Sequence, residues 1–189
     1  MKKVLGIIVV ALVAVSALAE STNITGNLMI RQTLNNTFTD NLGIQTVEQL
    51  TSNAVWAITS GKTAGKFEAI WSAKMTLTES ATQSYDLSGG LTNRFGKPIN
   101  FSSVKWIQLG AGSGNSGTIS MGNGLAHWAS LIGGTNQSIK IRPGAQVIFM
   151  APQTNSYLVT AGTGDILKFK NDATAYTNTL TVFIGGTVL

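Results

Sequence analysis

Residues 112–117, Gly-Ser-Gly-Asn-Ser-Gly, match the G-x-G-x-x-G pattern of loops that bind dinucleotide phosphates. That function also requires a helix opening at the last glycine and an acidic residue about twenty positions later. Here the chain continues as Thr-Ile-Ser-Met, a strand pattern, and no acidic residue occurs between Asp86 and Asp165. We therefore interpret the motif as a flexible connection between strands and predict no cofactor site.

His127 is the only histidine in the chain, which excludes a metal site built from several histidines. A hydrolase triad would pair it with a serine and an acid, but the sequence contains no G-x-S-x-G elbow and no acidic residue near His127. The chain has no cysteine, so disulfides and thiolate chemistry are excluded as well. We expect a histidine packed beside Trp128 in a loop and predict no catalytic or metal-binding residue.

A glycosidase would need two carboxylates facing one cleft, and the acidic residues are spread singly along the chain. They are Glu20, Asp40, Glu48, Glu68, Glu79, Asp86, Asp165 and Asp172, and their spacing favours no pair. The four tryptophans, Trp56, Trp71, Trp106 and Trp128, are candidates for a carbohydrate-binding face. Because Trp71 and its neighbours alternate as core residues do, we expect burial to be the main role of these rings. A glycan is kept as an alternative partner, and the chain is predicted not to be an enzyme.

Charged residues are only 11% of this 189-residue chain, against about 25% in ordinary soluble domains. Outside the first nineteen residues, eleven basic residues face eight acidic ones. The basic residues form no run and are not interleaved with aromatic residues, which argues against nucleic acid as the main partner. A weakly charged surface rich in hydroxyl groups favours subunits that pack against copies of themselves.

Residues 1–19 have the pattern of a signal peptide. Met-Lys-Lys forms a basic start, residues 4–15 are apolar, and Ala-Leu-Ala before Glu20 matches an A-x-A cleavage site. The apolar run is shorter than the ~20 residues of a membrane span. An uncleaved membrane anchor and a prepilin-type leader cut after Gly6 remain the alternatives. We therefore expect an exported, extracellular protein whose only membrane contact would be an uncleaved leader.

The elements are predicted to be organised around residues 138–152, where two strand patterns meet at Arg142-Pro-Gly-Ala145. Pro143 presets φ for the second position of a turn, and Gly144 supplies the positive φ that the third position of a type II turn needs. A plain hairpin would oppose an apolar face to a mixed one, so we expect a bulge or a corner between two sheets.

The remaining pattern predicts an all-β protein, a single β-sandwich with a jelly-roll-like arrangement and an extended N-terminal arm. Residues 23–34 read as a strand or arm, 35–41 as a loop, and 44–58 as either a helical stripe or, as we prefer, a strand at 55–58 that forms a hairpin with 66–78. Further strands are expected at 85–87, 101–109, 118–121, 157–160, 165–170 and 177–187, with a structured loop at 91–100 and no clear assignment for 125–134. The strand at 101–109 is predicted to be apolar on both faces, with Val104 and Trp106 on one and Ile107 and Leu109 on the other. In the last two strands the residues expected to face inward are Leu167, Phe169, Leu180, Val182 and Ile184. The expected divisions are a leader at 1–19, an arm at 20–52 and the sandwich at 53–189.

From about Val55 onward, over about two-thirds of the chain, the sequence resembles small, mostly uncharacterised virion-type proteins of bacteriophages and prophages. The resemblance is carried by residues 61–65, 76–89, 91–96, 99–105, 141–144 and 159–169. These are turn and strand motifs, and they carry over no active-site residue. The resemblance implies a jelly-roll-like capsid, decoration or fibre subunit.

An export leader has no use in a virion protein that assembles in the cytoplasm, so the sequence leaves a second function open. We predict a non-enzymatic structural protein that assembles with copies of itself, as a bacteriophage virion component. The alternatives are an exported subunit of a bacterial surface layer or extracellular filament, and a secreted carbohydrate-binding module.

Overall fold

The computed structural model describes residues 24–39, 45–93, 95–134, 136–153 and 156–189. The strands are β1 (Thr25–Thr39), β2 (Gln45–Ser60), β3 (Lys66–Phe67), β4 (Ala69–Leu77), β5 (Thr82–Asp86), β6 (Leu91–Thr92), β7 (Pro98–Ile99), β8 (Phe101–Ala111), β9 (Ile119–Gly122), β10 (Ser138–Ile141), β11 (Gln146–Met150), β12 (Tyr157–Leu158), β13 (Ile166–Asn171) and β14 (Asn178–Val188). The single helix among the described residues is α1 (Ala129–Ile132). The predicted all-β class is confirmed.

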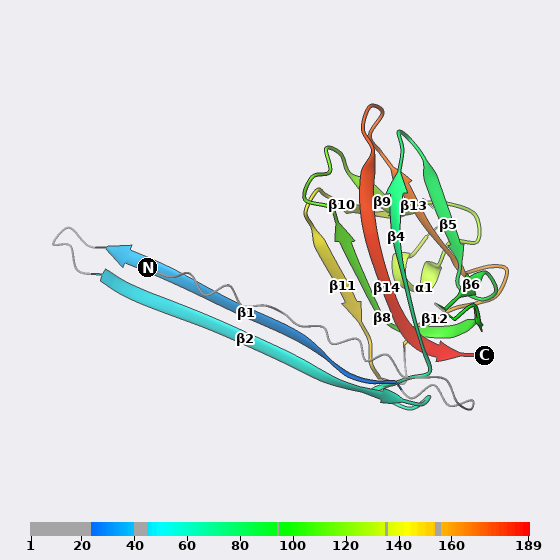
Figure 1. Cartoon of the computed structure of the whole chain (residues 1–189), viewed down its shortest axis with the longest axis horizontal. Helices are drawn as coiled ribbons and strands as arrows, with labels where there is room; N and C mark the ends of the chain where they lie inside the picture. Colours follow the sequence, from blue (N-terminus) through cyan, green and yellow to red (C-terminus); the bar gives the residue numbers. More distant parts are fainter. Residues whose placement is uncertain (1–23, 40–44, 94, 135, 154–155) are drawn as a thin grey trace.

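The body of the molecule is a sandwich of two antiparallel sheets (Figure 1). One sheet has the strand order β10-β9-β13-β5, and the other has the order β11-β8-β14-β4, with β12 also pairing with β8. Their facing sides share one core, which includes Trp71, Ile107, Leu109, Leu180, Val182 and Ile184 from the second sheet and Ile119, Met121, Ile141, Leu167 and Phe169 from the first. The predicted inward positions of β13 and β14 are confirmed.

The turn at residues 142–145 joins the two sheets. The Ala145 N–H donates to the Arg142 carbonyl at 3.0 Å, and Gly144 has φ 73°, as a type II turn requires. β10, before the turn, belongs to one sheet, and β11, after it, belongs to the other. The predicted corner is therefore confirmed, and these two strands form neighbouring edges of the sandwich.

β8 was expected to carry Val104 and Trp106 on the same face. Instead Val104 lies in the sandwich core and Trp106 lies in a separate cluster with Ile58 and Phe67. The pairing of β8 with β14 shows why, because Gly185 pairs with Trp106 and Gly186 with Val104, which leaves Lys105 as an extra, bulged residue. A bulge inverts the alternation of a strand, and this one turns Lys105 outward from the shared core.

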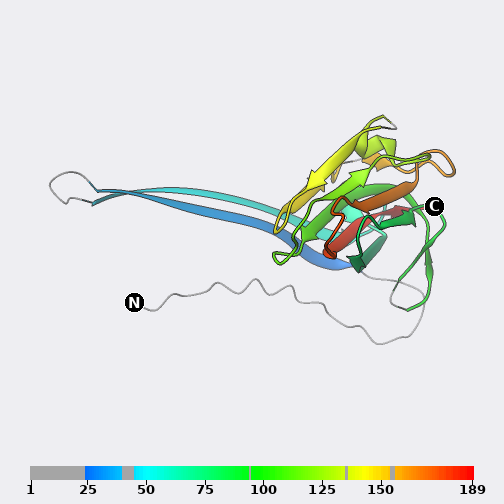
Figure 2. The ribbon, with the colours of Figure 1, turned by 90° about the horizontal axis from the view of Figure 1, so that it is seen from above.

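The N-terminal strands form a long hairpin that projects from the lower end of the sandwich (Figures 1 and 2). β1 and β2 pair antiparallel along their whole length, from Thr25 opposite Thr59 to Thr39 opposite Gln45. The prediction of a loop at 35–41 is wrong for residues 35–39, which continue β1, while residues 40 and 41 lie outside the described residues.

The expected hairpin between 55–58 and 66–78 is also wrong. β2 pairs antiparallel with β1 and meets β3 only through a short parallel contact at Thr59 and Ser60. The expected strand at 66–78 divides into β3 and β4, and the arm expected to end at residue 52 continues to Ser60. The expected structured loop at 91–100 contains the small hairpin β6–β7, and 125–134 contains α1.

Candidate assembly arm and sheet-face groove

The hairpin of β1 and β2, here called the arm, has two faces of different composition. Directly paired residues and every second residue along a strand share a face. The register in this way groups Leu28, Ile30, Leu34, Phe38, Leu50, Ala54, Trp56 and Ile58 on one face. The same face also carries two directly opposed polar pairs, Gln32 with Ser52 and Asn36 with Glu48. The opposite face carries mainly Thr, Asn and Gln. The first face is therefore richer in apolar residues than the other, and they form patches between the base of the arm and Phe38.

The base of the arm packs on the outer side of the β11-β8-β14-β4 sheet. Ile58, Phe67 and Trp106 form a buried cluster, against which Ile24 and Ile148 pack. Since Ile58 belongs to the apolar face of the arm, this face is continuous with a packed interface at the base. Farther out, the ribbon leaves the sandwich (Figure 1).

Lys105 fixes the loop that connects the arm to the sandwich. Its side chain is 1% exposed, and its Nζ donates to the carbonyls of Lys62, Thr63 and Lys66, each at 2.8 Å. Burial lowers the pKa of the Lys105 ammonium below its ordinary 10.5, and the charge of Glu68 partly opposes this shift. The Gly65 N–H adds a hydrogen bond to the Pro152 carbonyl at 2.7 Å. The bulge in β8 thus positions one cation to hold the arm's attachment point.

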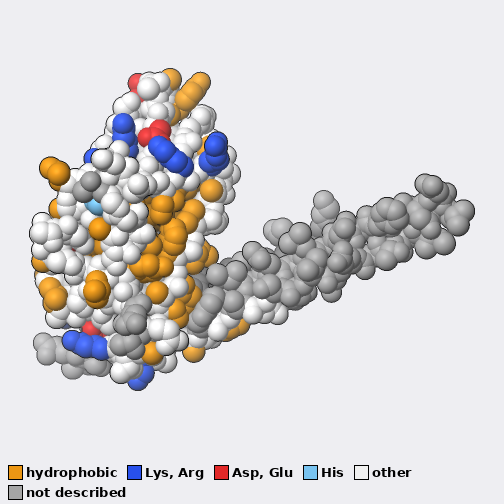
Figure 3. Space-filling model, turned by 180° about the vertical axis from the view of Figure 1, so that it is seen from behind, with side chains coloured by type: hydrophobic (Ala, Val, Ile, Leu, Met, Phe, Trp, Pro, Cys, Tyr) orange, Lys and Arg blue, Asp and Glu red, His pale blue; other side chains and the backbone are white. Residues whose placement is uncertain are grey.

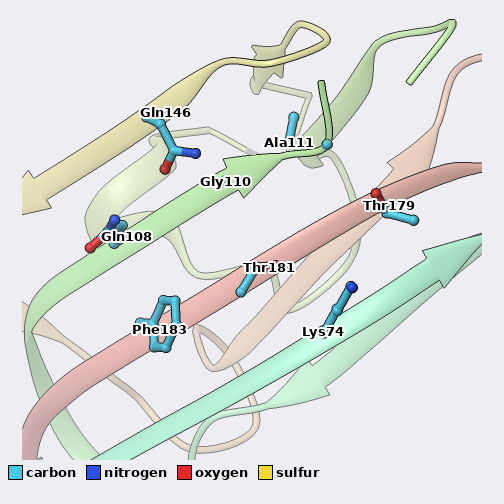
Figure 4. Close-up of a pocket in the computed structure, with 9 residues that line it drawn as sticks. Lys74, Gln108, Gly110, Ala111, Gln146, Thr179, Thr181 and Phe183 are labelled. Carbon is cyan, nitrogen blue, oxygen red and sulfur yellow. The ribbon is translucent and has the colours of Figure 1, made fainter. Parts of the chain in front are cut away.

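A groove of about 400 Å³ lies on the same outer sheet face, beyond the base of the arm (Figure 4). The side chains around it come from four strands: Lys74 from β4, Thr179, Thr181 and Phe183 from β14, Gln108 from β8 and Gln146 from β11. The strand pairing explains their proximity, because Lys74 and Gly110 both oppose Thr181, and Gly110 also opposes Gln146.

Gly110 gives the Gln146 amide room to lie over the strand in this groove. A Cβ atom at Gly110 would lie 2.8 Å from Nε2 of Gln146, so any larger residue would displace that amide. At one end, the Phe183 ring is 38% exposed and stacks on Trp106, with ring centroids 6.3 Å apart and planes at 13°. The groove is therefore polar along its length and has an aromatic wall at one end.

His127 and Trp128, which the sequence predicts to pack side by side in a loop, are both buried. His127 is buried, and its Nδ1 and Nε2 lie 3.1 and 2.7 Å from the carbonyl oxygens of Gly124 and Gly133. Trp128 is fully buried, and its Nε1–H donates to the Leu158 carbonyl at 2.8 Å. The contacts of His127 are thus those of a residue that holds the loop around α1.

The glycine-rich residues 112–117 connect β8 to β9 without a helix, as the sequence interpretation required. The loop is held by side-chain hydrogen bonds. Asn115 Nδ2 donates to the Thr179 carbonyl at 2.8 Å, and Asn178 Oδ1 accepts from the N–H groups of Ser116 and Gly117. The asparagines therefore attach this connection to the start of β14.

Two acidic residues that the sequence did not pair lie close together in the structure. Ser88 Oγ is 3.1 Å from Asp86 Oδ1 and 2.7 Å from Asp165 Oδ2. Asp165 is 3% exposed and also accepts from the Gly162 N–H at 2.6 Å, while its Oδ1 has no hydrogen-bond partner among the described residues. These bonds join the end of β5 to the loop before β13.

Asp172 forms the other polar cluster, on the surface of the β10-β9-β13-β5 sheet. Its Oδ2 accepts from Lys140 Nζ at 2.8 Å and from the Ser120 hydroxyl. Burial by itself would raise the pKa of Asp172, but the hydrogen bonds from Lys140 and Ser120 and the charges of Lys140 and Lys170 outweigh it and hold the pKa below 3.8. The cluster joins β9, β10 and the chain after β13.

The tryptophans in the sandwich are buried, with Trp71 and Trp106 exposed by 8% and 9% and Trp128 not exposed. The side chain of Trp56 is outside the described set. In the part of the chain that the structure describes, no group of three or more His, Cys, Asp or Glu residues could hold a metal ion. No helix there has the length and apolar character needed to cross a membrane.

Comparison with protein-family models, with curated proteins and with solved structures finds no match to this chain. The arm and the groove are the two features of the described residues that point to a function.

Proposed function

We propose that this chain is a non-enzymatic structural subunit that assembles with copies of itself through its arm. The observation that carries the proposal is the projecting hairpin, one face of which carries apolar patches between its packed base and Phe38. A two-stranded ribbon is marginally stable in water unless its apolar face is covered. The occupant that fits best is the same face of a second copy, because two such ribbons can stack as two layers of a sandwich.

The size of the arm is consistent with a specific contact. A strand of 15 residues is about 50 Å long at ~3.3 Å per residue, and two paired strands are about 10 Å wide. Stacking two arms would then bury about 500 Å² on each copy, or about 1,000 Å² in total. This total reaches the lower bound for a specific protein interface.

The surface of the sandwich adds support. Seen from behind, charged side chains gather in a few places, while uncharged and apolar side chains cover most of the remaining described surface (Figure 3). Subunits with so few charges can pack closely without strong repulsion. The resemblance to virion-type proteins favours a capsid, decoration or fibre subunit of a bacteriophage with a jelly-roll-like arrangement. An exported surface-layer or filament subunit is the alternative.

The assembly proposal is tested by shortening the arm. Replacing residues 31–53 by Asn-Gly would join Ile30 to Ala54, which are directly paired, through a two-residue turn that hairpins favour. The base of the arm and its contacts with Phe67 and Trp106 remain. We expect light scattering and negative-stain electron microscopy to show assemblies for the full chain and folded monomers for the shortened one. A full chain that stays monomeric at high concentration would contradict the proposal.

A matched pair of variants tests the apolar face itself. Leu34 and Leu50 are directly opposed on that face, and Thr33 and Thr51 are directly opposed on the other. Changing Leu34 and Leu50 to Gln is expected to weaken assembly at least tenfold, because two apolar side chains would no longer be buried. Changing Thr33 and Thr51 to Gln should leave it unchanged. Equal effects of the two variants would show that the apolar face is not the contact.

A further inference from the structure

We propose that the groove on the β11-β8-β14-β4 sheet is a binding site for a neutral carbohydrate chain. This inference is independent of assembly, because the groove lies within one chain and includes no residue of the arm. The unpaired polar groups around Gly110 and the aromatic ring beside them are the features that favour such a ligand.

The polar side chains of the groove have free hydrogen-bonding capacity. Lys74, Gln108, Gln146 and Thr181 make no side-chain hydrogen bond to another described residue, although they line one hollow. An amide provides two N–H donors and an oxygen acceptor, and a hydroxyl provides both kinds of group. Sugar hydroxyls likewise donate and accept hydrogen bonds. Two amides and a threonine therefore match a sugar better than they match a ligand that can only accept hydrogen bonds.

The Phe183 ring supplies the apolar part of the site. A pyranose ring has an apolar C–H face, which packs on the flat face of an aromatic side chain. Stacking on Trp106 holds the Phe183 ring in place and so reduces the entropy that binding would cost. The volume of about 400 Å³ is at the lower end of ligand sites, and it suits a short stretch of a sugar chain rather than a large molecule.

The same residues argue against other ligand classes. A phosphate or nucleotide site would use several cations or a helix N-terminus, and this groove has one lysine on a sheet. A docked peptide would require apolar pockets, and Phe183 is the one large apolar side chain among the lining residues. The chemistry that remains is a neutral, hydroxyl-rich ligand.

The test begins with the full-length purified protein on an array of immobilised neutral hexose and N-acetylhexosamine oligosaccharides, with uronic acid and sialic acid oligosaccharides alongside. We expect binding to neutral oligosaccharides. The strongest of these is then titrated in solution by calorimetry. No binding, or binding only to the acidic oligosaccharides, would overturn the proposal.

Variants locate the site. Changing Gln108 and Gln146 together to Ala should weaken affinity at least tenfold, since two hydrogen-bonding amides are lost. Gly110→Leu should abolish binding by filling the hollow. Gln83→Ala removes an exposed glutamine of β5 on the other sheet and should change nothing. Melting temperatures verify that each variant is folded, and affinity retained in the folded Gln108 and Gln146 double variant would overturn the assignment. Electron microscopy of the same variants reports on assembly separately.

Discussion

At the scale of single residues, the most consequential side chain is the buried Lys105. It donates three hydrogen bonds and is buried, whereas Lys140 donates two, to Ser120 and Asp172, and its side chain is 57% exposed. A buried ammonium is tolerated only when its donors are satisfied, and here three carbonyls satisfy all three. The position of the arm therefore depends on a cation inside the protein.

Replacing Lys105 by Met keeps the length and apolar stem of the side chain and removes its donors. Because three carbonyls lose a charged partner, we expect the free energy of unfolding to fall by about 3 kcal/mol. Urea denaturation measures the change. Lys74→Met, which removes an exposed lysine of β4, is the control and should change stability little. Equal stability of the Lys105→Met variant and the parent would show that the buried ammonium does not hold the fold.

Asp172 predicts a dependence of stability on acid pH. Its pKa is lower in the folded protein than in the unfolded chain, so its contribution is present above 3.8 and is lost as pH falls through the lower, folded value. The effect should stay below about 1 kcal/mol, because solvent screens this partly exposed ion pair. Urea midpoints measured from about pH 5 to pH 2 should fall less steeply in Asp172→Asn than in the parent. Identical slopes would contradict this assignment.

At the scale of elements, the corner between β10 and β11 decides which strands share a sheet. Without the reversal at Pro143 and Gly144, β11 could not leave the sheet of β10 and pair with β8. The conformation that permits it is local, because Gly144 has positive φ and an added Cβ atom would meet only Ser113 Cα, at an ordinary contact distance of 3.8 Å. The constraint at this glycine is therefore one of backbone conformation and not of packing.

Gly144→Ala tests this constraint. Alanine at φ 73° is strained, so we expect a loss of about 1 kcal/mol in the free energy of unfolding. Gly114→Ala is the matched control, since Gly114 has no positive φ and nothing within 4 Å of its added Cβ. Thermal melting of both variants and of the parent measures the loss of stability in each. A Gly114→Ala variant that loses as much as Gly144→Ala would show that φ is not the cause.

At the scale of the whole molecule, the chain combines a sandwich with its own core and an arm attached to that sandwich at its base. The sandwich buries apolar residues from both sheets, and Ile24 and Ile58 pack the base of the arm against Phe67 and Trp106. We therefore expect assembly to depend on the arm and ligand binding to depend on the sandwich. If both proposals hold, an array of copies would present many grooves and bind a repeating glycan with increased avidity.

The sequence alone determined the features that depend on neighbouring residues. Alternation identified the inward residues Leu167, Phe169, Leu180, Val182 and Ile184, because the side-chain period of a strand is local. The Pro-Gly pair identified the corner at 142–145 for the same reason. The strand pattern after residues 112–117 and the lack of acidic residues between Asp86 and Asp165 were likewise local signals against a dinucleotide loop.

Only the tertiary structure decided which strands pair and what their faces bring together. The choice of β1 over residues 66–78 as the partner of β2 depends on contacts distant in sequence, and the Asn- and Thr-rich end of β1 gives little alternation to reveal it. The bulge at Lys105 arises from the register between β8 and β14. The groove brings together Lys74, Gln108, Gln146 and Thr181 from four strands. Their spacing along the chain could not predict this, because the order of strands in a sheet is set by the packing of the whole core.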